Sequence, residues 1–109
     1  MTVAQFAEKY EVNVISMEGG DREITGGYVG DLLSWVMGRA KSGDAWVTIM
    51  SNMNIAAVAA LTDVACIVLA EGVMPDEKVT AVAREKGINL LASDKTSFEL
   101  AGILAAEIQ

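Results

Sequence analysis

Two short polar clusters stand where the sequence could hold a ligand, each directly after an apolar segment. Ser51, Asn52 and Asn54 form the first cluster, and Ser93 and Thr96 belong to the second. Hydroxyl and amide groups at the start of a helix lie beside free backbone N–H groups, which attract anions. The same residue types are the preferred helix caps and turn formers. The two clusters therefore predict either an anion site or ordinary caps.

A third candidate is the segment 21–27, which reads Asp-Arg-Glu-Ile-Thr-Gly-Gly. Arg22 is its only cation, and a guanidinium can bind an anion through two hydrogen bonds. Gly26 and Gly27, which follow Thr25, permit the close approach of a ligand or of another backbone. The alternative is that Asp21 and Arg22 hold the loop through hydrogen bonds. The sequence supports both.

We expect this segment to meet the helix starts that follow the strands, so that one ligand site contains all of these groups. The predicted ligand-binding residues are Arg22, Thr25, Gly26, Gly27, Ser51, Asn52, Asn54, Ser93 and Thr96.

Several catalytic and cofactor chemistries are excluded by residue type. The chain has no His, which excludes the Ser-His-Asp and Cys-His arrangements. Its single Cys66 lies in an apolar segment and is expected to be an inert core residue. The glycine patterns at 26–30 and 38–43 fall short of the dinucleotide and P-loop motifs, because Thr25 and Asp44 stand where those motifs need Gly and Lys. We expect no metal and no cofactor, since capping or solvated turns explain the aspartates.

The elements that position these residues follow from the hydrophobic pattern. The β-branched and aromatic segment 46–50, the continuous apolar segment 66–69 and the short segment 88–91 predict strands, and segments 12–15 and 24–29 are expected to be extended. Helical spacing predicts helices between and after the strands from residue 46 onward. Such alternation is typical of right-handed βαβ units. The sequence predicts a single three-layer α/β domain with a mostly parallel, five-stranded sheet and helices on both faces. Its predicted core includes Val47, Ile49, Ile67, Val68 and Leu69.

Charge and hydropathy limit the partners. The formal net charge is −7 with only 8 Lys and Arg, so we expect no nucleic acid and no membrane as partner. No charged-then-apolar leader opens the chain, which favours the cytoplasm. A 52% hydrophobic content exceeds what so small a core absorbs, and Trp35, Phe98 and Ile103 fall off the apolar faces of their helices. We therefore expect a homodimer or another partner surface.

The segment 21–34 resembles the DRTGG domain, named for its Asp-Arg and Thr-Gly-Gly residues, here with Glu23 and Ile24 between the two parts. Segments 46–49, 54–58 and 97–101 are also similar to that family, so residues 1–109 form one DRTGG-like domain. The resemblance implies an α/β domain similar to the N-terminal domain of HPr kinase, without its kinase domain. It also implies a regulatory role at a dimer interface, as in phosphotransacetylases and CBS-domain pyrophosphatases.

The function predicted from residues and resemblance together is a non-enzymatic regulatory or ligand-sensing domain. It would act as a dimer and bind a small anionic metabolite or a nucleotide. One alternative is an adaptor protein for a metabolic enzyme complex, such as an iron-only hydrogenase system. Another is an enzyme acting on a phosphorylated metabolite, with Asp31 or Asp94 as general base. No candidate base has a visible partner that would tune its pKa, which disfavours the enzyme.

Overall fold

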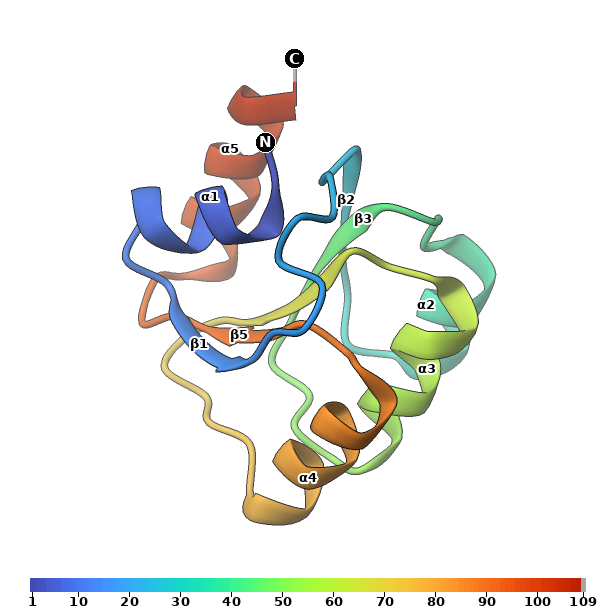
Figure 1. Cartoon of the computed structure of the whole chain (residues 1–109). Coiled ribbons are helices and arrows are strands. Elements are labelled where there is room, and N and C mark those ends of the chain that lie inside the picture. The colour runs from blue at the N-terminus through green and yellow to red at the C-terminus, as the bar shows by residue number, and fades with distance from the viewer. Residues whose placement is uncertain (109) are drawn as a thin grey trace.

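The computed structural model describes residues 1–108, which form five strands and five helices (Figure 1). In chain order these are α1 (Val3–Lys9), β1 (Asn13–Ser16), β2 (Gly26–Val29), α2 (Leu33–Arg39), β3 (Asp44–Thr48), α3 (Asn54–Thr62), β4 (Cys66–Leu69), α4 (Glu77–Lys86), β5 (Leu90–Ala92) and α5 (Ser97–Ile108). None of the helices in this part of the chain has the length and apolar character needed to cross a membrane.

The strands form one mixed sheet in the order β1-β5-β4-β3-β2. Strands β2, β3, β4 and β5 are parallel, and β1 pairs with β5 in the antiparallel direction. The predicted α/β domain with a mostly parallel, five-stranded sheet is therefore confirmed. We call the side where the four parallel strands begin the amino edge, and the side where they end the carboxyl edge.

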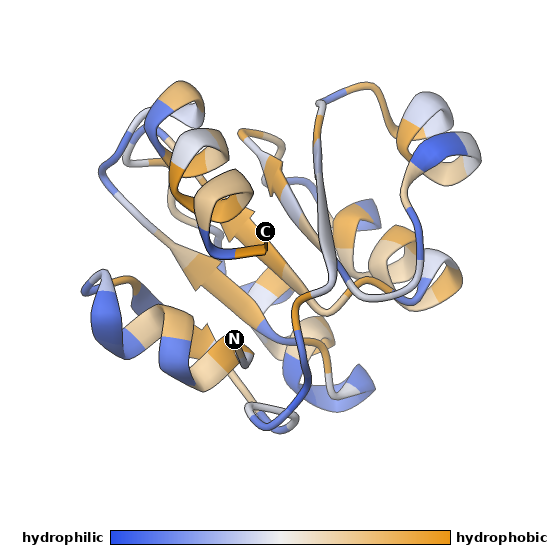
Figure 2. Cartoon of the chain, turned by 90° about the horizontal axis from the view of Figure 1, so that it is seen from above, coloured by the Kyte–Doolittle hydropathy of each residue, from blue (hydrophilic) through white to orange (hydrophobic). Residues whose placement is uncertain are grey.

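Helices cover both faces of the sheet. Helices α1 and α5 pack on one face, and α2, α3 and α4 pack on the other, so the domain has three layers (Figure 1). The strands between these layers consist mostly of hydrophobic residues, whereas the helices carry both hydrophobic and hydrophilic residues (Figure 2). Lys9 of α1 also reaches across to α5, where its Nζ lies 2.6 Å from Glu107 Oε1.

The buried core matches the predicted one at four positions of five. Val47, Ile67, Val68 and Leu69 are fully buried. The prediction for Ile49 is wrong, because its side chain is 46% exposed. Strand β3 ends one residue earlier, and the Ile49 N–H donates to the Asp31 carboxylate, which turns the chain out of the sheet.

Helices α1 and α4 have side-chain caps, whereas α2 and α3 have none at their N-cap residues. Thr2 and Gln5 form a capping box at α1, and Asp76 caps α4, which ends at Gly87 in the left-handed conformation. Asp31, which lies just before α2, does not cap that helix; its carboxylate accepts hydrogen bonds from Thr48 Oγ1 and from the backbone N–H of Ile49. It therefore joins the carboxyl ends of β2 and β3.

Candidate functional site

The nine predicted site residues lie at opposite edges of the sheet. Strand β2 starts at Gly26 beside Asp44, the first residue of β3. The amino edge therefore holds Arg22 and Thr25, and the first two residues of β2 are Gly26 and Gly27. The other five follow the carboxyl ends of β3 and β5: Ser51, Asn52, Asn54, Ser93 and Thr96. The expectation of one site containing both groups is thus wrong, because β2 runs in the same direction as β3 and the chain enters it from the amino edge.

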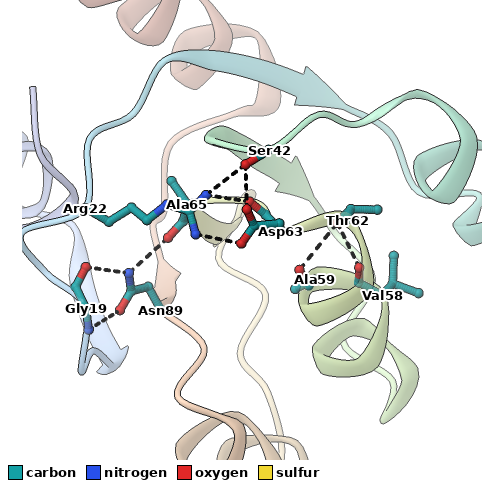
Figure 3. Close-up of polar contacts among 9 residues, drawn as sticks. All are labelled: Gly19, Arg22, Ser42, Val58, Ala59, Thr62, Asp63, Ala65 and Asn89. Carbon is teal, nitrogen blue, oxygen red and sulfur yellow. Dashed lines mark hydrogen bonds and ion pairs between the residues drawn. The ribbon is translucent and has the colours of Figure 1, made fainter.

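Arg22 is engaged with other parts of the protein at the amino edge (Figure 3). Its Nη1 lies 2.9 Å from Asp63 Oδ1, and its Nη2 donates to the Asp63 carbonyl oxygen at 2.7 Å. Ser42 Oγ lies 3.3 Å from Nη2 and donates to Asp63 Oδ2 at 2.5 Å. Asp63 ends α3 in the left-handed conformation. Arg22 thus joins the loop before β2 to the end of α3, which supports the loop-holding alternative.

Thr25 and Gly26 also pack closely against the residues at the start of β3. The Thr25 N–H donates to the carbonyl oxygen of Gly43, whose φ is +87°. A Cβ placed at Gly43 would overlap Thr25 Oγ1, and a Cβ at Gly26 would lie 2.5 Å from Asp44 Oδ1. The close approaches are made by Gly43, just before β3, and by Asp44, its first residue, so the first glycine of the Thr-Gly-Gly segment leaves room for the buried Asp44 carboxylate.

Asn89 is a buried polar residue at this edge that sequence reasoning missed (Figure 3). Its Nδ2 donates to the carbonyl oxygens of Gly19 and Ala65, both at 2.9 Å, and its Oδ1 accepts from the Gly19 N–H. Asn89 stands directly before β5, where a polar residue among apolar neighbours was the available signal. It holds the loop after β1 to the start of β4.

A polar hollow of about 310 Å³ lies between these contacts and the ends of α3 and α4. Arg22, Asp63, Lys86 and Asn89 contribute its polar lining. Two helices end here, and helix C-termini carry partial negative charge. This field and the pairing of Arg22 with Asp63 make the hollow a poor host for an anion.

The first polar cluster of the carboxyl edge surrounds the start of α3. The Asn54 N–H donates to Asn52 Oδ1 at 2.9 Å, which is a local turn. The residue at the N-cap position is Met53, and it makes no side-chain capping bond. The amide of Asn54 and the loop residue Ser51 lie beside this helix start.

The second polar cluster serves mainly as a cap. Thr96 and Glu99 form a capping box at α5: the Glu99 N–H donates to Thr96 Oγ1, and the Thr96 N–H donates to Glu99 Oε1, both at 3.1 Å. Hydrogen bonds from the Thr96 N–H and hydroxyl to the Glu99 carboxylate hold the pKa of that carboxyl below its ordinary value. Ser93 Oγ accepts from the Lys95 N–H and also lines a hollow of about 130 Å³ with Asp94.

Within the described residues, the Cys66 thiol is not an activated nucleophile, and there is no candidate metal centre. Cys66 is fully buried, and burial raises the pKa of its thiol to about 12, so it stays protonated and inert as predicted. Within residues 1–108, no three His, Cys, Asp or Glu side chains gather in a geometry that would hold a metal ion.

The Arg22–Asp63 pair predicts a dependence of stability on pH. Hydrogen bonds from Arg22 and Ser42 lower the pKa of Asp63 in the folded protein. The stabilisation from these bonds is therefore fully present above the pKa of Asp63 in the unfolded chain, about 3.9. It is lost as the pH falls through the lower pKa that Asp63 has in the folded protein. We expect Asp63→Asn, which tolerates the left-handed backbone, to unfold at lower urea concentration than the wild type at pH 7. The difference between the two proteins should shrink as the pH falls below about 3.9. Urea unfolding at pH 7 and at a series of acidic pH values measures this, and a difference that stays constant with pH would contradict it.

Comparison with known proteins identifies both the sequence family and the fold. The model of the family described as the DRTGG domain matches residues 29–106, beginning just after the Thr-Gly-Gly segment. The crystal structure of the CBS and DRTGG domains of the regulatory region of Clostridium perfringens pyrophosphatase, complexed with its activator diadenosine tetraphosphate, is similar with a TM-score of 0.73. The match covers 94% of this chain and 45% of that one at 13% identity. A search of curated proteins finds no match.

Proposed function

Since the chain belongs to the DRTGG domain family, we propose that it is a non-catalytic regulatory module that acts as a homodimer and responds to a small anionic ligand such as a nucleotide. The observation that carries the proposal is the family match across most of the chain. The related fold in the pyrophosphatase is part of a regulatory region. The crystal structure of that region contains a nucleotide activator. The part of it that is similar to this chain is less than half of its length.

We place the ligand at the carboxyl edge, on Ser51, Asn52, Asn54, Ser93 and Thr96. The supporting observation is that Arg22 already binds Asp63 and Ser42. At the start of α3 the N-cap residue Met53 makes no side-chain capping bond, and the local side-chain bond there joins the Asn54 N–H to Asn52 Oδ1. Backbone N–H groups at such a helix start favour negative charge. In this proposal the residues of the amino edge, Arg22, Thr25, Gly26 and Gly27, position the strands and do not contact the ligand.

Thermal unfolding with ATP, AMP and diadenosine tetraphosphate tests the ligand. A nucleotide present at about 100 times its Kd stabilises a protein by about 2.7 kcal/mol, which raises the melting temperature of a domain this size by about 10 °C. We expect one of the three to raise it, and inorganic sulfate at equal ionic strength to have a smaller effect. No shift with any of the three would contradict the proposed nucleotide response.

Two variants test whether the nucleotide binds at the start of α3. We expect Asn54→Ala to reduce the nucleotide-induced shift while the melting temperature without ligand changes little. Ser34→Ala, on the exposed side of α2, is the matched control and should keep the full shift. An undiminished shift in Asn54→Ala would remove the start of α3 from the ligand site.

The proposed homodimer is supported by large apolar side chains on the surface. Phe98 is 88% exposed and Trp35 is 54% exposed, with the Arg39 guanidinium stacked 4.0 Å from the Trp35 ring. Light scattering should give twice the 11.5 kDa of one chain. Exposed aromatic residues of this kind also support the adaptor function, in which they contact a metabolic enzyme. A mass of one chain at all micromolar concentrations would favour the adaptor over the dimeric module.

A further inference from the structure

Strand β2 is the last strand on its side of the sheet, and among the described strands it pairs only with β3. The Gly30 N–H donates to the Val47 carbonyl oxygen. Because backbone groups of alternate residues in a strand point in opposite directions, those of Tyr28 face β3 as well. The backbone groups of Gly27 and Val29 therefore face away from the sheet. An edge of this kind is a template for another strand.

An apolar hollow of about 160 Å³ lies along this edge, between β2 and α5. No residue that lines it is charged. Gly27 has no side chain, and Ala101 and Ala105, on the α5 side, have small ones. Val29 also lines the hollow, and its side chain is 50% exposed. The edge thus offers an apolar recess and an apolar projection two residues apart.

We propose that β2 pairs in the antiparallel direction with β2 of a second copy of this chain, and that Val29 of each copy enters the hollow over Gly27 of the other. This inference rests on the proposed homodimer and assigns its interface. Two strands related by a two-fold axis place residues of equal parity opposite each other, because opposite side chains share a face of the sheet. Centring the pair on Tyr28 places Val29 of one copy opposite Gly27 of the other. Both residues then have free backbone groups for the new ladder.

The β2 edge is a place where two copies of this chain can meet without bringing charged side chains together. Each copy has a net charge of −7, so two copies repel each other over most of their surface. The hollow and the β2 edge carry no charged side chain, and depletion of charge is typical of interface cores. A stable interface needs roughly 1,200–2,000 Å² of buried surface in total. Four-residue strands alone do not supply it, so the exposed side of α5 must contribute.

Sedimentation of single-site variants tests the interface. Val29→Asp places a carboxylate in the apolar hollow, and we expect it to weaken dimerisation by at least about 100-fold while the circular dichroism of the monomer is kept. Val14→Asp is the matched control, because Val14 is 42% exposed on β1 at the opposite edge. It should dimerise as the wild type does. Gly27→Leu should fill the hollow from within the same chain, keep the fold and also abolish the dimer.

Cross-linking tests the register of the two strands. Tyr28→Cys places two thiols directly opposite each other, in the non-hydrogen-bonded type of pair, where the Cα atoms are about 4.5 Å apart and a disulfide can form. We expect oxidation to link its two chains, whereas Val29→Cys stays unlinked. The buried Cys66 does not interfere. A monomeric wild type would overturn the proposed dimer together with this interface. A dimer that survives Val29→Asp and does not cross-link through residue 28 would overturn only the interface.

Discussion

Gly43→Ala should lower the free energy of unfolding by about 2–5 kcal/mol, the sum of strain in an unfavourable backbone conformation and overlap in a packed region. Gly43 has a φ of +87°, which residues with a Cβ rarely adopt. Its Cβ would also overlap the hydroxyl of Thr25. Neither cost can be relieved easily, because the Gly43 carbonyl oxygen accepts from Thr25 and its N–H donates to the Asp63 carbonyl oxygen. Urea unfolding measures the loss.

Two further variants separate the causes of this loss. Gly38→Ala makes the same substitution in α2, where a Cβ would have no neighbour within 4 Å, and should stabilise the protein by about 0.4–1 kcal/mol. In a Thr25→Ala background, Gly43→Ala should cost less than it does alone, because only the backbone strain remains. An equal cost in both backgrounds would show that Thr25 and Gly43 do not interact as described.

Ile67→Ala should cost about 2–5 kcal/mol, the usual range for truncating a fully buried aliphatic side chain. Ile67 lies in the middle of β4, with β3 and β5 on either side of it, and its side chain packs beneath the helices of one face. Removing three carbon atoms leaves a cavity that this sheet cannot close by a small shift. Calorimetry or urea unfolding gives the value.

The matched control is Ile49→Ala, which removes the same atoms from a side chain that is 46% exposed. We expect it to cost less than about 1 kcal/mol, since surface substitutions rarely cost more. Similar losses in both variants would mean that Ile49 is packed more tightly than its exposure indicates.

The strands and helices around Ile67 could be predicted because local pattern and tertiary environment agree there. A continuous run of apolar residues is what a parallel strand covered on both faces requires, and the caps at Thr2, Asp76 and Thr96 are local signals. The boundary of β3 could not be predicted, because the bond from Ile49 to Asp31 joins segments 18 residues apart. Pattern alone does not contain such a contact.

The residues of the candidate site were predicted individually but not their arrangement. The partner of Arg22 is Asp63, 41 residues away, and nothing in either local sequence indicates the pairing. The division of these residues between two edges of the sheet could be predicted from the sequence. In a parallel sheet, the residues before a strand and the residues after it lie at opposite edges. Applying that rule to β2 would have placed Thr25 away from Asn54.

The irregularity in β1 limits how many copies can join. The register of the β1–β5 pairing shifts between Val14 and Ser16, so the pairing is irregular there, and Nη2 of Arg84 in α4 lies 3.5 Å from the Ile15 carbonyl oxygen. Bulges and neighbouring charges prevent the regular addition of a further strand. A sheet with two open sides can grow without end into a fibre, whereas a sheet with one open side stops after a single addition. If β2 pairs as proposed, the open side of the sheet formed by the described strands would be used once, and the assembly would close with a fixed copy number.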